Sequence, residues 1–378
     1  MGLGAGYPLI CGSVIEAASP GWGTAATILN RIPVTKETLT DAVEMIEDMT
    51  LRGIAGQDAL DLGTIGVTGD IETDIRYTLK SGNYFCGSDL WLSAAMGATP
   101  VINASYVSTL FHTPSPNRPV TIVFDKKVSY WEYVSCMLNG FKVSGKTGEA
   151  LSASFPVVAH RLLRTGTANG STQFAALAAN GGKRVLFDDV VFRIGTLSDA
   201  LAAGDALGIN EFTLDYNSNL SEPEYSTPDY GTTVGAGTHG ANTTTQSQRL
   251  TLQPARNGKR TCMLDFTLPR YQADTLFTWK AGGTPLQVDI KTSIDTAART
   301  FSILCPRLIL ESVDGNVDSP AMFPVKVKAR LLWNGGTSSA TIYNDYMTNS
   351  VDTTNKIPNE FEIEISNTTD GRTAAIWS

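Results

Sequence analysis

The sequence predicts a mainly β protein made of two similar halves, each a β-sandwich that carries one short helix. Two observations predict this fold. Blocks of sequence occur twice in the same order, and short apolar or alternating segments are separated by turns rich in Gly, Asn and Pro. The 378 residues suffice for two domains, because a domain usually holds about 100–200 residues.

The first repeated block is a glycine followed, at the same distance, by an aromatic-Thr-Leu ending. It spans residues 69–79, where the aromatic residue is Tyr77, and residues 258–268, where it is Phe266. Both copies come before a predicted helix, so we expect a strand at each place.

The second repeated block predicts a short helix in each half. It spans residues 89–100 and 274–285. Each copy starts with Asp, a favourable residue at a helix N-terminus, and continues through an apolar middle. Gly97 and Gly282 supply the left-handed stop, and a proline three residues later prevents continuation.

The third repeated block predicts a strand, a turn and a second strand. Its second strand covers residues 155–163 and 323–332. Each copy follows an apolar run (133–138; 301–310) and a connection of hairpin length (142–150; 312–319). In the later copy Lys326, Lys328 and Arg330 alternate with apolar residues, which indicates a strand with one buried face.

Three blocks in the same order favour a duplication. The alternative is that hairpins and short helices resemble one another in general, which explains one block better than all three. We therefore expect a first domain over 1–180 with an N-terminal arm, and a second over 181–333, opened by a strand at 184–194. A polar loop at 225–248 lies in the second domain. A C-terminal extension over 334–378 contains a strand at 359–366 that adds an edge strand or reaches a neighbour.

Composition argues against several functions. A net charge of −8 disfavours nucleic-acid binding by phosphate neutralisation, and 17% charged residues is a low share, typical of surfaces that become protein contacts. The five scattered cysteines indicate neither a disulfide framework nor a zinc site and suit a reducing compartment. No secretory signal and no membrane span are predicted, so we expect no membrane insertion.

One motif resembles a phosphate-binding loop. Residues 140–147 read Gly-Phe-Lys-Val-Ser-Gly-Lys-Thr, and Asp188 ends a later strand-like run. A nucleotide hydrolase would need a helix directly after the loop, but residues 149–158 alternate like a strand. The corresponding stretch of the other half, 310–318, lacks Gly-Lys-Thr. We interpret the motif as a Gly-rich hairpin turn.

No other constellation predicts chemistry. The three histidines, His112, His160 and His239, are too separated for a metal triad, and each is expected on the surface or hydrogen-bonded. An acidic cluster (Asp41, Glu44, Glu47 and Asp48) is interpreted as the solvated side of an amphipathic or capped segment, with a catalytic pair or a lumen-facing role as alternatives. We predict no catalytic, cofactor-binding or metal-binding residues, no cofactor, and no enzymatic activity.

Several diffuse motifs together resemble the tail tube (major tail) proteins of long-tailed bacteriophages, in particular the class with two tube domains in one chain. They are Glu16 with residues 21–24, residues 32–34, the strand entry at 68–71, the helix ending at Gly97, and residues 211–220. The loop at 225–248 and the chain after residue 334 depart from the family pattern.

This resemblance implies a structural role in the virion. Sheets from adjacent domains would close an inner β-barrel, three chains would form a ring with pseudo-sixfold symmetry, and stacked rings would conduct viral DNA without binding it specifically. The implied partners are further copies of the chain, a tape-measure protein, and tail terminator or tip proteins, with assembly in the host cytoplasm. We expect the 225–248 loop and the N-terminal arm to make the contacts between rings.

Two other classes of function remain open on sequence grounds. The duplication also fits other β-sandwich structural components, such as a capsid decoration, baseplate or secretion-tube protein. An enzyme or a glycan-binding module is the remaining class, and nothing in the sequence supports it beyond the phosphate-loop match.

Overall fold

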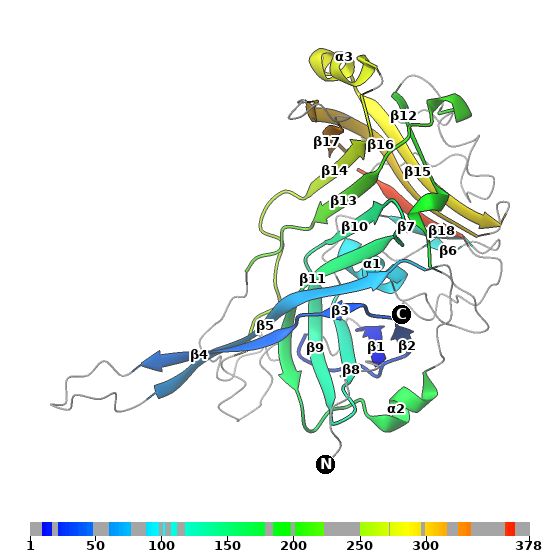
Figure 1. The fold of residues 1–378 in the computed structure, drawn as a ribbon. Coiled ribbons are helices and arrows are strands. Elements are labelled where there is room, and N and C mark those ends of the chain that lie inside the picture. The colour runs from blue at the N-terminus through cyan, green and yellow to red at the C-terminus, as the bar shows by residue number, and fades with distance from the viewer. Residues whose placement is uncertain are drawn as a thin grey trace.

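The structure is a computed structural model that describes residues 10–16, 22–47, 60–76, 88–97, 101–102, 107–111, 118–177, 184–197, 201–222, 250–271, 273–295, 299–315, 324–333 and 360–366. These residues form a large antiparallel sheet with few helices (Figure 1). The predicted mainly β fold is therefore confirmed. We call residues 10–177 the first half and residues 184–333 the second half.

The elements of the first half are β1 (Ile10–Ile15), β2 (Asn30–Ile32), β3 (Lys36–Glu37), β4 (Thr40–Glu47), β5 (Leu60–Asp74), α1 (Ser88–Met96), β6 (Val101–Ile102), β7 (Val107–Phe111), β8 (Val120–Asp125), β9 (Tyr130–Leu138), β10 (Phe141–Lys146), β11 (Ser152–Leu163) and α2 (Ser171–Ala176). The sequence did not predict the short helix α2.

The remaining elements are the single-turn helix η1 (Phe187–Asp189), β12 (Val190–Thr196), η2 (Ala203–Asp205), β13 (Glu211–Asn217), β14 (Thr261–Leu268), α3 (Thr275–Gly282), β15 (Leu286–Asp295), β16 (Arg299–Asp314), β17 (Val325–Leu331) and β18 (Glu362–Ser366). The strand expected over 184–194 thus begins only at Val190, after η1.

The two halves have the same strand order. In the first half the neighbours run β1, β8, β9, β11, β5 and then β3 with β4, and β2 is an additional strand on the other side of β1. In the second half they run β12, β15, β16, β17, β14 and β13. Each strand of the second half thus has a counterpart in the first, at the same place in the chain and in the sheet.

Two irregularities of the halves coincide as well. The β8–β9 hairpin has a bulge between Val120 and Ile122, and the β15–β16 hairpin has one between Leu286 and Val288. The register of β16 on β17 shifts between Leu310 and Ser312, where the first half has the break between β9 and β10. A bulge changes local twist, so matched bulges give both halves a similar curvature.

Two connections join the halves into one sheet (Figure 1). β10 of the first half pairs with β13 of the second, and β18 pairs with β16 on one side and with β7 on the other. The predicted strand at 359–366 is therefore present, but it lies inside the sheet of its own chain. The expectation of an edge strand was wrong because the short β17 leaves part of β16 uncovered.

The helices end as predicted, with one difference. α1 is followed by Gly97 at φ 67°. After α3 the left-handed residue is Gly283, at φ 58°, and the predicted stop Gly282 is the last helical residue. α1 is buried against the sheet, and its Trp91 packs edge-on to Phe155 with ring centroids 5.5 Å apart.

A buried ion pair ties β12 to β15. The guanidinium of Arg193 donates to Oδ2 of Asp289 at 3.1 Å, and both side chains are nearly inaccessible. Burial raises the pKa of Asp289 to about 6, and the charges of Arg193 and Lys291 oppose this rise only in part. The folded protein therefore holds a proton on Asp289 more tightly than an unfolded Asp, whose pKa is about 3.9.

This shift makes stability depend on pH. Because the folded state binds the additional proton, the contribution of Asp289 falls as pH rises from about 4 to about 6. Urea unfolding at several pH values should show wild type losing stability relative to Asp289→Asn over this window. A difference that grew with pH would mean that attraction by Arg193 outweighs burial.

Candidate assembly interface

The strand pair that joins the two halves is a complete antiparallel ladder. β10 and β13 pair without interruption from Phe141 opposite Tyr216 to Lys146 opposite Glu211. Alternate residues of both strands are buried, and the others face outward. On the outward side Lys142 and Asp215 form an exposed ion pair at 3.4 Å. Such a pair contributes little energy, so the ladder depends mainly on its backbone bonds and its buried face.

An aromatic cluster closes the buried face of this junction. Phe141 lies 5.3 Å from Tyr216 and 6.4 Å from Phe155 between ring centroids. Phe361, directly before β18, lies 5.8 Å from Phe141 and 5.5 Å from Tyr216. Rings from β10, β11, β13 and the β18 segment therefore meet at one point, so the C-terminal segment helps hold the two halves together.

The motif that resembles a phosphate-binding loop forms part of this junction. Residues 141–146 are strand β10, and the next long element is strand β11, so the helix that would hold phosphates is absent from this described segment. Thr147 donates its hydroxyl to the carbonyl of Asn210, and Asp188 accepts from the amide of Gly148. The connection between β10 and β11 covers only residues 147–151, whereas the predicted connection covered 142–150.

Of the three histidines, His160 lies within the described residues, and it makes structural contacts. His160 is buried, its Nδ1 lies 2.9 Å from the carbonyl of Thr251, and its ring meets Trp22 edge-on. His112 and His239 lie outside the described residues. The described residues hold no group of three or more potential metal ligands.

The predicted acidic cluster lies on a strand. Asp41, Glu44 and Glu47 belong to β4, which pairs with β5, while Asp48 lies outside the described residues. Asp41 accepts two bonds from Arg164, at 2.7 and 3.0 Å. This residue is therefore part of a structural contact.

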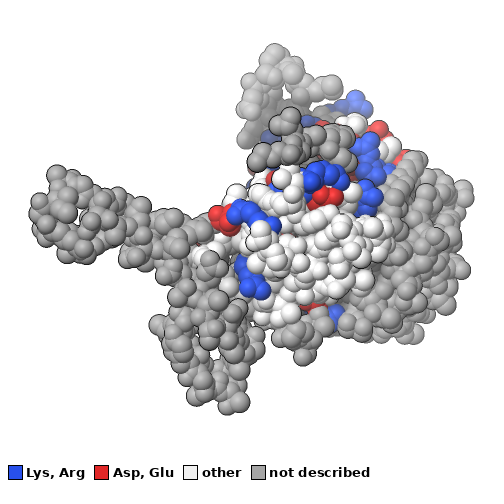
Figure 2. Space-filling view, turned by 90° about the horizontal axis from the view of Figure 1, so that it is seen from below, with Lys and Arg blue, Asp and Glu red and all other residues white. Residues whose placement is uncertain are grey.

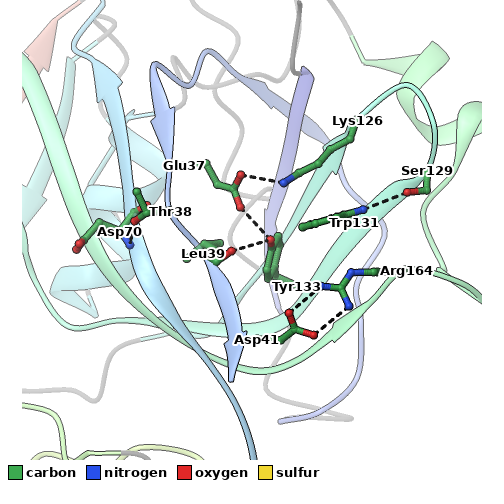
Figure 3. A network of polar contacts seen from close by, with 10 residues as sticks. All are labelled: Glu37, Thr38, Leu39, Asp41, Asp70, Lys126, Ser129, Trp131, Tyr133 and Arg164. Atoms are coloured by element: carbon green, nitrogen blue, oxygen red, sulfur yellow. Dashed lines mark hydrogen bonds and ion pairs between the residues drawn. The ribbon is translucent and has the colours of Figure 1, made fainter. Parts of the chain in front are cut away.

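A polar network fixes β3 and the start of β4 against the β8–β9 hairpin (Figure 3). Glu37 accepts from Nζ of Lys126 at 3.0 Å and from the hydroxyl of Tyr133 at 2.9 Å. The Tyr133 hydroxyl also lies 3.4 Å from the carbonyl of Leu39. Since β3 is four strands away from β8 in the sheet, these bonds show that the first-half sheet curls back on itself.

Trp131 extends this network through its ring. Nζ of Lys126 lies 3.7 Å from its centroid, and Cζ of Arg164 lies 4.6 Å from it. Cation–π contacts of this kind add attraction where the cations are partly removed from water. The same two cations pair with Glu37 and Asp41, so one tryptophan orders both anchors of the β3–β4 segment (Figure 3).

Burial keeps the phenol of this network protonated. Loss of water, followed by the charge of Glu37 and its hydrogen bond, raises the pKa of Tyr133 far above its usual range. Tyr133 therefore remains a hydrogen-bond donor. Sequence reasoning missed Glu37, Lys126 and Tyr133, because no local spacing signals a contact between residues about ninety positions apart.

A buried carboxylate fastens the segment that follows β1. Glu16 accepts bonds from the hydroxyl of Thr121 at 2.7 Å, and from the amide and hydroxyl of Ser135 at 2.9 and 2.7 Å. Burial raises the pKa of Glu16, and the three donors lower it in part. Ser135 also accepts from the amide of Gly23, which continues the chain of bonds toward Trp22. Glu16 is thus a structural anchor.

The β4–β5 hairpin extends away from the body as an arm (Figure 1). Its described pairing runs from Thr40 opposite Thr68 to Glu47 opposite Leu60. The outer edge of β4 has no strand partner among the described residues. This arm and the edge at its base are the parts of the first half most available to another molecule.

The surface carries no large field of one sign in the view from below (Figure 2). Most of the described surface there is uncharged, and acidic and basic side chains lie near one another.

The four described cysteines, Cys11, Cys136, Cys262 and Cys305, are free and buried, and burial raises the pKa of each thiol. No helix in the described residues is long and apolar enough to cross a membrane.

The chain matches a known protein family over most of its length. A family model described as phage tail tube protein matches residues 12–355 and so covers most of the chain, both halves included. A search of curated proteins finds no match.

The ion pair between Glu37 and Lys126, which anchors β3, should show a strong energetic coupling. In a double-mutant cycle of Glu37→Gln and Lys126→Met, we expect a coupling energy of about 1–3 kcal/mol in urea unfolding, because the Glu37 side chain is largely buried. The exposed pair Lys36–Glu72, measured with Lys36→Met and Glu72→Gln, should show a much weaker coupling, because both charges stay in water. Equal couplings would contradict the role of the network as an anchor.

Packing at the junction should exclude even one methyl group. A Cβ on Gly145 would lie 2.3 Å from Leu151 and 2.7 Å from Phe187, so Gly145→Ala should destabilise the fold by about 1–3 kcal/mol in urea unfolding. Gly204 has open space around it, and Gly204→Ala serves as the control with little expected change. A loss for Gly145→Ala no larger than for the control would show that the buried face is loosely packed.

Proposed function

The chain belongs to the phage tail tube protein family, and on that premise we propose that it forms stacked rings that conduct viral DNA from the capsid into the host. Membership makes it a structural component of a phage tail. The proposal requires no catalysis, cofactor or metal ion. Rings would assemble in the host cytoplasm, on a tape-measure protein and between tip and terminator proteins.

The observation that carries the proposal is the matched strand order of the two halves. It supports two tube domains in one chain, over 1–180 and 181–333, with the 334–378 extension contributing β18 to the joint sheet. In this arrangement one chain supplies two of the units of a ring. Three chains then give a ring with pseudo-sixfold symmetry.

Contacts between rings must come from parts that project from the body. The β4–β5 arm projects in this way (Figure 1), and we assign it to the neighbouring ring. The 225–248 loop and the N-terminal arm, which lie outside the described residues, are assigned the same role. A contact between unlike surfaces does not close on itself, so repeated stacking produces a tube.

Charge compensation on the exposed sheet face fits a passive conduit. Lys36 pairs with Glu72, Lys142 with Asp215, and Arg330 with Glu311, so several cations have an acidic partner beside them. Strong DNA binding needs many uncompensated cations to replace the counterions of phosphate. If this face lines the lumen, DNA meets a wall that does not hold it.

Electron microscopy of the purified chain tests the proposal. We expect filaments or rings, and mass photometry of rings should give three copies of the 40.4 kDa chain. A chain that stays monomeric at high concentration, with a cooperative unfolding transition, would overturn the proposed function.

Removing the arm separates ring formation from stacking. Because Ala42 lies opposite Gly66, residues 43–65 can be replaced by an Asn-Gly turn at the same strand pair. We expect folded rings that no longer stack into long tubes, seen by negative-stain microscopy. Deleting 232–245 tests the loop in the same way. Tubes of normal length from the arm variant would show that the arm is not a stacking element.

A further inference from the structure

The corresponding sheet edges of the two halves differ in whether they have a strand partner. β10 of the first half pairs with β13 of the second. The counterpart of β10 is the end of β16, and the counterpart of β13 is β3 with the start of β4. In the described part of the chain, neither counterpart has a strand partner along its outer edge. Each chain thus keeps one edge of each kind open.

The matched bulges fix which residue of β16 corresponds to which residue of β10. Cys136 lies opposite Val120 at the first-half bulge, and Leu308 lies opposite Leu286 at the same bulge of the second half. Six residues after Cys136 in the chain is Lys142, which belongs to β10 and pairs with Ser154. The same number of residues after Leu308 leads to Asp314, which pairs with Lys326.

The register across the sheet matches Thr40 with Asp215 in the same way. Met137 and Ile309 are counterparts by the same bulges. From Met137 the cross-strand row runs through Val158 and Thr68 to Thr40. From Ile309 it runs through Arg330 and Met263 to Asp215.

We infer that Val313–Gly315 at the end of β16 of one chain pairs antiparallel with Leu39–Asp41 of a second copy, in the register of β10 on β13. Because Lys142 lies opposite Asp215 inside the chain, Asp314 lies opposite Thr40 between chains. This inference rests on the proposed function and names the surface through which its rings close.

The side chains on these edges suit such a pairing. Val313 and Leu39 are buried on the inward side, and Asp314 and Thr40 face solvent, which is the alternation seen in β10 and β13. The Glu37 network already holds β3 in place (Figure 3). Pairing with a second copy therefore costs little conformational entropy. The two edges differ from each other, so the contact repeats head to tail and can close a ring.

The contact between chains is more polar than the junction within one chain. Val313 and Asp41 stand where the inner junction has Phe141 and Tyr216, and the described residues place no aromatic cluster there. On the outward side Asp314 faces Thr40, where the inner junction has the Lys142–Asp215 ion pair. A single substitution can therefore add or remove charge complementarity.

Paired cysteines test the register. Residues directly opposite in a ladder are close enough for a disulfide, so Thr40→Cys with Asp314→Cys should form bonds between chains when assembled rings are mildly oxidised. Non-reducing gels should show multiples of the chain mass. Lys142→Cys with Asp215→Cys, at the matching internal pair, should form a bond within one chain.

A displaced pair is the control. Lys36 lies four residues from Thr40, about 13 Å along the strand, so Lys36→Cys with Asp314→Cys should not cross-link. Cross-linking by the displaced pair, or none by Thr40 and Asp314 in rings where the internal pair closes, overturns the inference and leaves the proposed function standing. Absence of any assembly in microscopy overturns both.

Charge substitutions give a second measurement without oxidation. Thr40→Lys should lower the concentration needed for half-assembly by up to about fivefold, since opposite charges directly across strands attract. Thr40→Asp should raise it by a similar factor, and adding Asp314→Lys should restore assembly. Failure of the reversal to rescue Thr40→Asp would contradict the proposed register.

Discussion

The backbone ladder between β10 and β13 is the contact on which the rest of the structure depends. Strand edges carry unpaired N–H and C=O groups, and this ladder satisfies a row of them while it merges two sheets. The rings of Phe141, Tyr216 and Phe361 exclude water from its inner side. β18 adds a second connection between the halves, since it pairs with β16 on one side and with β7 on the other.

Local features of the fold could be predicted from the sequence, and long-range pairings could not. Capping and stop residues located α1 and α3, and alternation located β17 with its buried and exposed faces. The ladder of β10 on β13 joins residues about seventy positions apart, and no local pattern encodes it. For the same reason Gly145 was assigned to a turn, although it packs against Leu151 and Phe212 inside a strand pair.

The candidate site shows the same division. The sequence indicated Asp41 as one of a row of acids, but its structural role is the ion pair with Arg164, which directly follows β11. No sequence pattern indicated Glu37, although it anchors β3 through Lys126 and Tyr133. A polar anchor of this kind suits an edge that must tolerate water before it finds a partner, whereas the aromatic cluster suits a junction that never opens.

In the proposed ring, two tube units are joined in one polypeptide, and this changes how a ring can begin to form. A junction held within a chain is present at an effective concentration of the millimolar order, whatever the amount of protein in the cell. Every second junction of the proposed ring is therefore made when a single chain folds, and fewer molecules must collide to close it. The β10–β13 ladder thus lowers the kinetic order of nucleation, so a scarce protein can still start a tail promptly.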